Sequence, residues 1–356
     1  MRNKENMEQL FSLIKEKQGP SFSMDEEAIR QAYQKNTEEQ SIALKILAIC
    51  GAIFGNLTFI GFLYVAGFYD SPMALSIVGA MSIVGSLLIS KFSKKITYDA
   101  LSISSYLIGL IVIAAALIQL EASENIIASL ILLISIGTLL LVENYVHVFF
   151  AVLTLIGALL FLFVSNFLYE YTVYIITLLG LLTSYVFLNE GKIITRSKWM
   201  NIRYKPIRIA LVIAFLNCLN YLTNYTPSEL SLVNHWLNAV ALVAVIAWVV
   251  YRIMENLALS NKVHKIGIYA FMTLFILPTT YSLGITGSLL IILLSYQVNY
   301  RTSFVLGIIY FIGFLIYFYY NLQITLIVKS MLLIIPGILA LGVYIFTQKL
   351  LSDEKI

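Results

Sequence analysis

Residues 126–142 read IIASLILLISIGTLLLV, a run that contains no charged side chain. Its apolar residues cover all sides of a helix rather than one stripe, which is typical of a membrane span and not of an amphipathic core helix. At a rise of about 1.5 Å per residue, such a run nearly crosses a hydrocarbon core of about 30 Å. The stretch therefore predicts a transmembrane helix.

The same pattern recurs throughout the chain of 356 residues, which is 60% hydrophobic and 12% charged. Soluble domains are far less apolar. We predict an all-α polytopic membrane protein with about twelve transmembrane helices. They are expected near residues 43–68, 72–90, 98–120, 125–142, 145–164, 168–188, 207–224, 231–252, 266–282, 285–300, 303–320 and 323–347.

Four boundaries divide this chain. An N-terminal tail with short helices (residues 1–42) precedes helices 1–6 (residues 43–188), and a basic loop at residues 189–206 separates them from helices 7–12 (residues 207–347). Residues 348–356 form a C-terminal tail. The N-terminal tail is expected to be a solvated extension, and the alternative is that it lies on the membrane surface or binds a partner.

Lysine and arginine occur only in alternate gaps between the predicted helices. Because basic residues of short loops stay in the cytoplasm, this alternation predicts a multi-pass protein of the bacterial cytoplasmic (inner) membrane with both termini in the cytoplasm. The net charge of +4 is explained by this orientation and does not indicate nucleic-acid binding. The basic gaps hold Lys91, Lys94, Lys95, Lys192, Arg196, Lys198, Arg203, Lys205, Arg208, Arg252, Lys262, Lys265 and Arg301, whereas the others hold Asp70, Glu121, Glu124, Glu170 and Glu229.

Lys329 is the exception, because it lies inside the last predicted helix. A charged residue within a span costs about 2.5–3.5 kcal/mol at the helix centre, so it is a site hypothesis by default. Either its stem snorkels to the outer interface, which we favour, or its ammonium binds an outer carboxylate, a lipid headgroup or an anionic substrate. Thr325 and Ser330 would supply oxygens beside it.

Asparagines form the second candidate polar site. Three of them follow the spacing i, i+3 and i+7 on the seventh predicted helix, and the eighth begins with two more and a histidine. Hydrogen bonds between helices are the favoured interpretation, and a polar vestibule at the outer side is the alternative. The residues are Asn217, Asn220, Asn224, Asn234, His235 and Asn238.

Two glycine-containing segments interrupt or line the predicted helices. Pro278, Gly284 and Gly287 break the hydrophobic pattern, and we expect a helix-ending turn there rather than an unwound, cavity-lining segment. Gly51 and Gly55 have the GxxxG spacing that allows close packing of helices.

Motifs for catalysis or cofactor binding are missing from the sequence. There is no phosphate loop, nucleophile elbow or metal-ligand cluster, and the two cysteines, Cys50 and Cys218, both lie in predicted helices. We therefore expect no enzymatic activity, no cofactor and no metal, and membrane lipid is the expected surrounding partner.

The carboxy-terminal third ends in a tyrosine run, a short polar turn and a Thr-Leu-x-x-Lys-Ser sequence that opens the final helix. The matching residues are Tyr317, Tyr319, Tyr320, Thr325, Leu326, Lys329 and Ser330. This pattern resembles an uncharacterised bacterial family of polytopic inner-membrane proteins that carries a domain-of-unknown-function label. The family usually has Gly-Phe and Arg-Gly-Asn sequences after the tenth helix, where this chain has YQVN at residues 296–299. The resemblance implies a membrane protein without an assigned reaction, in a complex with a small membrane-anchored partner named for a Gly-Asp-Tyr motif.

Three function classes follow from these features. A non-enzymatic component of a membrane complex fits the short outer loops and the acidic tail best. The alternative is a transporter or permease for a small or amphipathic solute, which fits the number of helices and the polar outer features. A membrane enzyme fits least, because such enzymes need carboxylates, histidines or a large domain outside the membrane.

Overall fold

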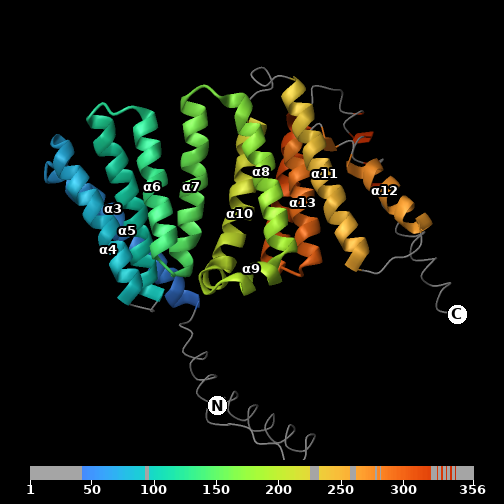
Figure 1. Cartoon of the computed structure of the whole chain (residues 1–356). Helices are drawn as coiled ribbons and strands as arrows, with labels where there is room; N and C mark the ends of the chain where they lie inside the picture. The colour runs from blue at the N-terminus through green and yellow to red at the C-terminus, as the bar shows by residue number, and fades with distance from the viewer. Residues whose placement is uncertain are drawn as a thin grey trace, which may run out of the picture.

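A computed structural model describes residues 42–92, 96–224, 232–256, 262–276, 279–280 and 282–321, and separate positions between residues 327 and 341. Throughout these residues the chain is α-helical, apart from short turns and 3-10 segments. The helices run up and down side by side, with neighbouring segments of the chain antiparallel (Figure 1). The all-α prediction is therefore confirmed.

Helix boundaries follow the hydrophobic runs closely. The described helices are α3 (Ile42–Val65), α4 (Pro72–Phe92), α5 (Ile96–Gln119), α6 (Glu124–Leu141), α7 (Tyr145–Ser165), α8 (Tyr169–Leu188), α9 (Glu190–Arg196), α10 (Lys198–Asn224), α11 (Leu232–Asn256), α12 (Lys262–Ile276), α13 (Leu283–Gln297) and α14 (Arg301–Asn321), with a 3-10 turn at Phe68–Asp70. Eight of them are long and apolar enough to cross a membrane. The count of twelve membrane helices and the orientation of the termini stay predictions, and the helix expected at 323–347 lies largely outside the described residues.

Residues 189–206, expected as a loop, are mostly helical. The short helix α9 fills the first part, and α10 begins at Lys198 rather than at residue 207. Ser197 starts α10, because its hydroxyl accepts the backbone N–H of Met200 at 3.2 Å in the manner of an N-cap. The basic residues here were expected on the cytoplasmic side of the membrane. The side chains of Arg203, in this segment, and of Arg208, two residues after it, are buried in the helix bundle.

We call the end of the bundle that carries Lys91, Arg196, Arg252 and Arg301 the basic end. These residues lie at or near the ends of α4, α9 and α11 and at the start of α14. The short helix α9 lies at this end, at the lower edge of the view, and the α7–α8 connection lies at the opposite end (Figure 1).

Helices α4 and α5 cross with their backbones nearly in contact. A Cβ atom built at Gly109 would lie 2.9 Å from the carbonyl oxygen of Gly79 and 3.1 Å from the backbone nitrogen of Ile83. Backbone atoms cannot move aside as a flexible side chain can. The crossing therefore requires glycine at both positions, a packing mode common between membrane helices.

Gly109→Ala is expected to lower the free energy of unfolding by about 2 kcal/mol, because the added methyl overpacks the crossing. Gly85→Ala is the matched control on α4, since a Cβ there meets nothing within 4 Å. That control should be neutral or stabilising by up to about 1 kcal/mol, because alanine favours helix more than glycine does. Denaturant unfolding in detergent micelles measures both, and equal effects of the two substitutions would contradict the close crossing.

The main core lies around α13. Ten of its residues are buried, among them Gly284, Thr286, Gly287 and Ser288. It contacts α8, α10, α11 and α14, and the buried side chains of these helices form one hydrophobic cluster. Helices α3–α5 have smaller clusters of their own and meet the remaining helices through α5, which contacts α6 and α7. The molecule thus has a large body and an α3–α5 bundle beside it (Figure 1).

Close packing was the expected role of Gly51 and Gly55, and no described helix packs against either of them. No described atom lies within 4 Å of a Cβ built at either glycine, and both residues are exposed. This face of α3 is directed away from the other described helices.

Candidate functional site

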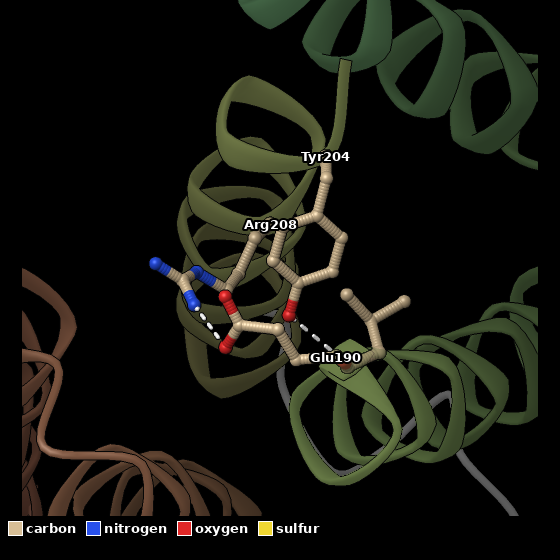
Figure 2. A network of polar contacts seen from close by, with 4 residues as sticks. Glu190, Tyr204 and Arg208 are labelled. Carbon is tan, nitrogen blue, oxygen red and sulfur yellow. Dashed lines mark hydrogen bonds and ion pairs between the residues drawn. The ribbon is translucent and has the colours of Figure 1, made fainter. Parts of the chain in front are cut away.

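An ion pair lies inside the basic end of the body. Arg208 of α10 donates from Nη1 to Oε2 of Glu190, the first residue of α9, at 2.9 Å (Figure 2). The arginine side chain is 7% exposed and that of the glutamate 35%. The pair is therefore shielded from solvent on the arginine side and partly open on the glutamate side.

Aromatic rings enclose the guanidinium. Its Cζ atom lies 3.9 Å from the ring centroid of Tyr300, 5.2 Å from that of Tyr204 and 5.6 Å from that of Phe187. These are cation–π distances, and such contacts strengthen when the cation is desolvated. Tyr204 is itself buried and donates its hydroxyl to the carbonyl oxygen of Val186 at 3.0 Å (Figure 2). Four elements, α8, α9, α10 and the α13–α14 turn, thus meet at one positive charge.

Arg208 lies within the candidate membrane span Lys198–Thr223 of α10. It is about 24 Å along the helix axis from Asn224, the last residue of α10, at about 1.5 Å per residue. A hydrocarbon core is about 30 Å thick, so Arg208 would lie inside it, near the basic end, with Asn224 at the opposite boundary. A buried charge within a span is a functional-site hypothesis by default.

Unpartnered polar atoms gather around the same end of the body. Arg208 Nε is buried without a described hydrogen-bond partner, as are Ser295 Oγ and Gln297 Oε1 at the end of α13 and Ser303 Oγ at the start of α14. The α13–α14 turn carries Tyr300, which stacks on Arg208 and donates its backbone N–H to the carbonyl oxygen of Ser295 at 2.9 Å. The site therefore contains hydrogen-bond donors and acceptors that have no partner among the described residues.

Arg203 has a different role from Arg208. Its Nε donates to the carbonyl oxygens of Leu139 and Val142 at 3.0 and 3.1 Å. Its Nη2 donates to that of Leu140 at 3.2 Å, and Trp199 covers the guanidinium at 4.6 Å from the ring centroid. These contacts cap the C-terminus of α6, where carbonyls have no partner within the helix and a positive charge is favourable.

A second polar region lies at the opposite end, where α12 meets α13. Both helices have 15 residues, or about 22 Å, so neither spans about 30 Å of hydrocarbon. Of the residues that connect them, the structure describes Thr279, Thr280 and Ser282. Thr286 donates to the carbonyl oxygen of Thr279 at 2.8 Å, and the two hydroxyls lie 3.0 Å apart. Thr280, Ser282 and Thr286 are buried, whereas Pro278 lies outside the described residues.

The asparagines whose side chains the structure describes contact different helices. Asn217 accepts a hydrogen bond from the Tyr310 hydroxyl of α14 at 2.8 Å, whereas Asn238 is buried and accepts one from Thr177 of α8. Asn220 is exposed and has an interaction of its own. Asn224, Asn234 and His235 lie in α10 and α11, but their side chains lie outside the described residues. A shared outer vestibule stays a prediction.

Thr177→Val is expected to lower the free energy of unfolding by about 1 kcal/mol, because it removes the hydrogen bond to Asn238 between two membrane helices. Thr195→Val is the matched control, since Thr195 is exposed and bonds only within α9 among its described contacts. Thermal unfolding in the same detergent compares the two. Equal midpoints would mean that the Thr177–Asn238 bond does not stabilise the bundle.

Lys329 and Thr325 lie outside the described residues, and Ser330 is partly exposed and has an interaction of its own. The lysine hypothesis therefore stays a prediction. Among the described residues, no three His, Cys, Asp or Glu side chains are placed to hold a metal ion.

Arg208, Glu190, Tyr204 and Tyr300 were missed by the sequence reasoning. Each basic residue near a helix end satisfies the positive-inside rule, whether its side chain reaches solvent or the bundle interior. Two signals were present: Tyr204 and Arg208 have i, i+4 spacing on one helical face, and Arg208 begins an almost uninterrupted apolar run. Together they place a cation and a ring inside the end of a span.

Comparison with known proteins gives one match. Residues 42–350, most of the chain, match the model of the family described as Domain of unknown function (DUF4401). Searches of curated proteins and of solved structures found no match.

Proposed function

The chain belongs to the DUF4401 family, and we propose that it is a non-enzymatic membrane permease for a small solute. In this proposal the Arg208–Glu190 pair closes the basic end, which faces the cytoplasm of a bacterial inner membrane. The observation that carries the proposal is the Arg208 guanidinium, which is buried among three aromatic rings within a candidate membrane span and paired with Glu190.

A buried ion pair is a poor way to stabilise a helix bundle. The desolvation of two charges offsets much of their attraction, and apolar residues of similar size often stabilise a protein as well or better. An ion pair can, however, be broken and formed again as helices move. It links α9 and α10 to the α13–α14 turn through Tyr300, so its opening would release the basic end of α13.

The buried residues Thr280, Ser282 and Thr286 support a permease over a purely structural component. Their hydroxyl groups lie at the N-terminus of α13, a helix too short to span the hydrocarbon core, so in this proposal they lie below the membrane surface. A helix N-terminus carries a partial positive charge and free N–H groups, and transporters use such half-helix ends to contact solutes. With the charge pair at the basic end, α13 has a polar region near each of its ends.

Proteoliposomes test the proposal directly. Stopped-flow light scattering would follow the entry of glycerol, urea and acetate into vesicles with and without the protein. We expect at least one of these solutes to enter faster with the protein present, and Glu190→Ala to change that rate. If all rates match those of protein-free vesicles, for the native chain and for Glu190→Ala, the permease proposal fails for small polar solutes.

A second candidate function is a component of a membrane complex, and the open face of α3 favours it. Gly51 and Gly55 would let a single transmembrane helix of a small membrane-anchored partner approach closely. Native-membrane purification of the tagged chain tests this candidate. Gly51→Ile combined with Gly55→Ile should abolish copurification of such a partner, whereas the control Gly85→Ile should retain it. Retention by both would contradict the docking role of α3.

A further inference from the structure

A buried histidine joins the α3–α5 bundle to the body. His147 of α7 is fully buried, and its Nε2 lies 3.1 Å from the hydroxyl oxygen of Ser102 on α5. The Ser102 hydroxyl also donates to the backbone carbonyl oxygen of Ser86 on α4. The histidine therefore lies at the place where three helices meet.

These two contacts determine the tautomer of His147. A serine hydroxyl has one hydrogen, and only that hydrogen can be shared with a carbonyl oxygen. Since Ser102 gives its hydrogen to Ser86, Nε2 of His147 must carry the hydrogen of the contact with Ser102. In the neutral ring, Nδ1 is then an acceptor with a free lone pair.

Nδ1 has no described hydrogen-bond partner, although it is buried. The same is true of two neighbouring groups, the Ser86 Oγ and the Tyr106 hydroxyl, and all three residues are at most 1% exposed. The rings of Tyr106 and His147 are 5.9 Å apart. Three buried polar atoms without described partners thus belong to neighbouring residues of α4, α5 and α7, which we call the His147 cluster.

We propose that this cluster is a binding site for a water molecule that donates to Nδ1 of His147. Buried polar groups are almost always hydrogen-bonded, and an internal water makes about three hydrogen bonds, which equals the number of unpartnered atoms here. The water would donate to Nδ1 and to Ser86 Oγ and would accept from the Tyr106 hydroxyl. This arrangement gives each of the three atoms one hydrogen-bond partner of the complementary kind.

The charged side chains near the site are bound elsewhere or exposed, so a neutral ligand is left as the partner of His147 Nδ1. On α5, Asp99 accepts a hydrogen bond from Asn144 Nδ2 at 2.8 Å, and Asn144 in turn accepts the backbone N–H groups of Val146 and His147 as the N-cap of α7. Glu143 in the α6–α7 turn is exposed, Lys91 at the end of α4 is exposed, and Arg203 of α10 is bound to the carbonyls of α6. No described cation is directed at Nδ1.

The bound water has a consequence for the helices around it. A water shared by Nδ1, the Ser86 Oγ and the Tyr106 hydroxyl would form hydrogen bonds to residues of α4, α5 and α7. The site would therefore join the α3–α5 bundle to the body through hydrogen bonds. It is independent of the Arg208–Glu190 pair and does not require that the chain transports a solute.

Solid-state NMR of the full chain in lipid bilayers tests the water site, with ¹⁵N-labelled histidine. The chain has three histidines, and His147→Gln assigns the relevant signals by their loss. We expect a protonated Nε2, a non-protonated Nδ1 and magnetisation transfer from water to Nδ1. A protonated Nδ1, or a non-protonated Nδ1 that receives no transfer from water, would overturn the proposal.

Two variants locate the water. Ser86→Ala combined with Tyr106→Phe removes two of its three partners, so the transfer to Nδ1 should be lost while the Nε2–H signal remains. Ser82→Ala is the control on α4, because its hydroxyl donates to the carbonyl oxygen of Val78 in its own helix. Undiminished transfer in the double variant would place the water elsewhere and overturn the assignment.

Discussion

Arg203→Met is expected to lower the free energy of unfolding by about 3 kcal/mol, because it removes the cap of α6. The guanidinium donates to the carbonyl oxygens of Leu139, Leu140 and Val142. Each buried acceptor that loses its donor costs about 1–3 kcal/mol, although the contributions are not additive. The favourable interaction of a cation with the C-terminus of α6 is lost as well. Denaturant titration in detergent micelles measures the change.

Two matched variants separate capping from charge. Arg203→Lys keeps the charge but cannot span three carbonyls, so it should recover only part of the loss. Arg196→Met removes an exposed arginine from the same end and should change the stability by less than about 0.5 kcal/mol. If Arg203→Met costs no more than Arg196→Met, the capping role of Arg203 is wrong.

Glu190→Ala is expected to lower the free energy of unfolding by about 3 kcal/mol. Removal of one partner leaves the Arg208 guanidinium buried without a counter-charge, and breaking a buried pair in this way costs about 3–5 kcal/mol. The lower value applies because the Glu190 side chain is 35% exposed, so solvent already screens part of the interaction. The three aromatic rings around Arg208 also retain some stabilisation of its charge.

A double-mutant cycle identifies the pair as the cause. Arg208→Met removes the charge, and Glu190→Ala combined with Arg208→Met should cost less than the sum of the single changes by about 1–3 kcal/mol. Glu255→Ala is the control, because it breaks the exposed Arg252–Glu255 pair, worth about 0–1 kcal/mol. Additive effects at Glu190 and Arg208 would show that the two side chains do not interact energetically.

The helix arrangement was predictable from the sequence because hydrophobic runs and charge alternate with little ambiguity. Most boundaries agree within a few residues, as for α7 (Tyr145–Ser165, expected at 145–164). The exception is α10, because its first residues, 198–206, are rich in basic and aromatic side chains and were expected to form a loop. That segment is helical because Ser197 caps it and because carbonyls of α6 and Glu190 satisfy its arginines.

The charged site was not predictable in the same way. Sequence spacing shows which residues share a helical face, but it does not show what that face contacts. Asn217 and Asn238 illustrate this, since hydrogen bonds between helices were the favoured interpretation, but the spacing did not identify the partner helices, which are α14 and α8. Likewise, Tyr300 is far from Arg208 in the sequence, and only the packing of α13 and α14 against α10 brings their side chains together.

In the proposed function the Arg208–Glu190 pair closes the basic end. The protection of an introduced cysteine from labelling tests this closure without knowledge of the solute. A chain with Cys50→Ala and Cys218→Ala would carry Ser303→Cys as the reporter, since Ser303 is fully buried in the first turn of α14. Two reporters serve as controls. Thr302→Cys is the exposed neighbour, and Thr138→Cys is a buried position on α6.

The measurement is the rate of reaction of each cysteine with a membrane-impermeant maleimide, in lipid nanodiscs where both faces are accessible. With the pair intact, Ser303→Cys should react slowly. With Glu190→Ala it should react about tenfold faster or more, since a loss of about 1.4 kcal/mol in closure is a factor of ten, while Thr302→Cys stays fast and Thr138→Cys stays slow. Equal rates at Ser303→Cys with and without Glu190 would contradict the account.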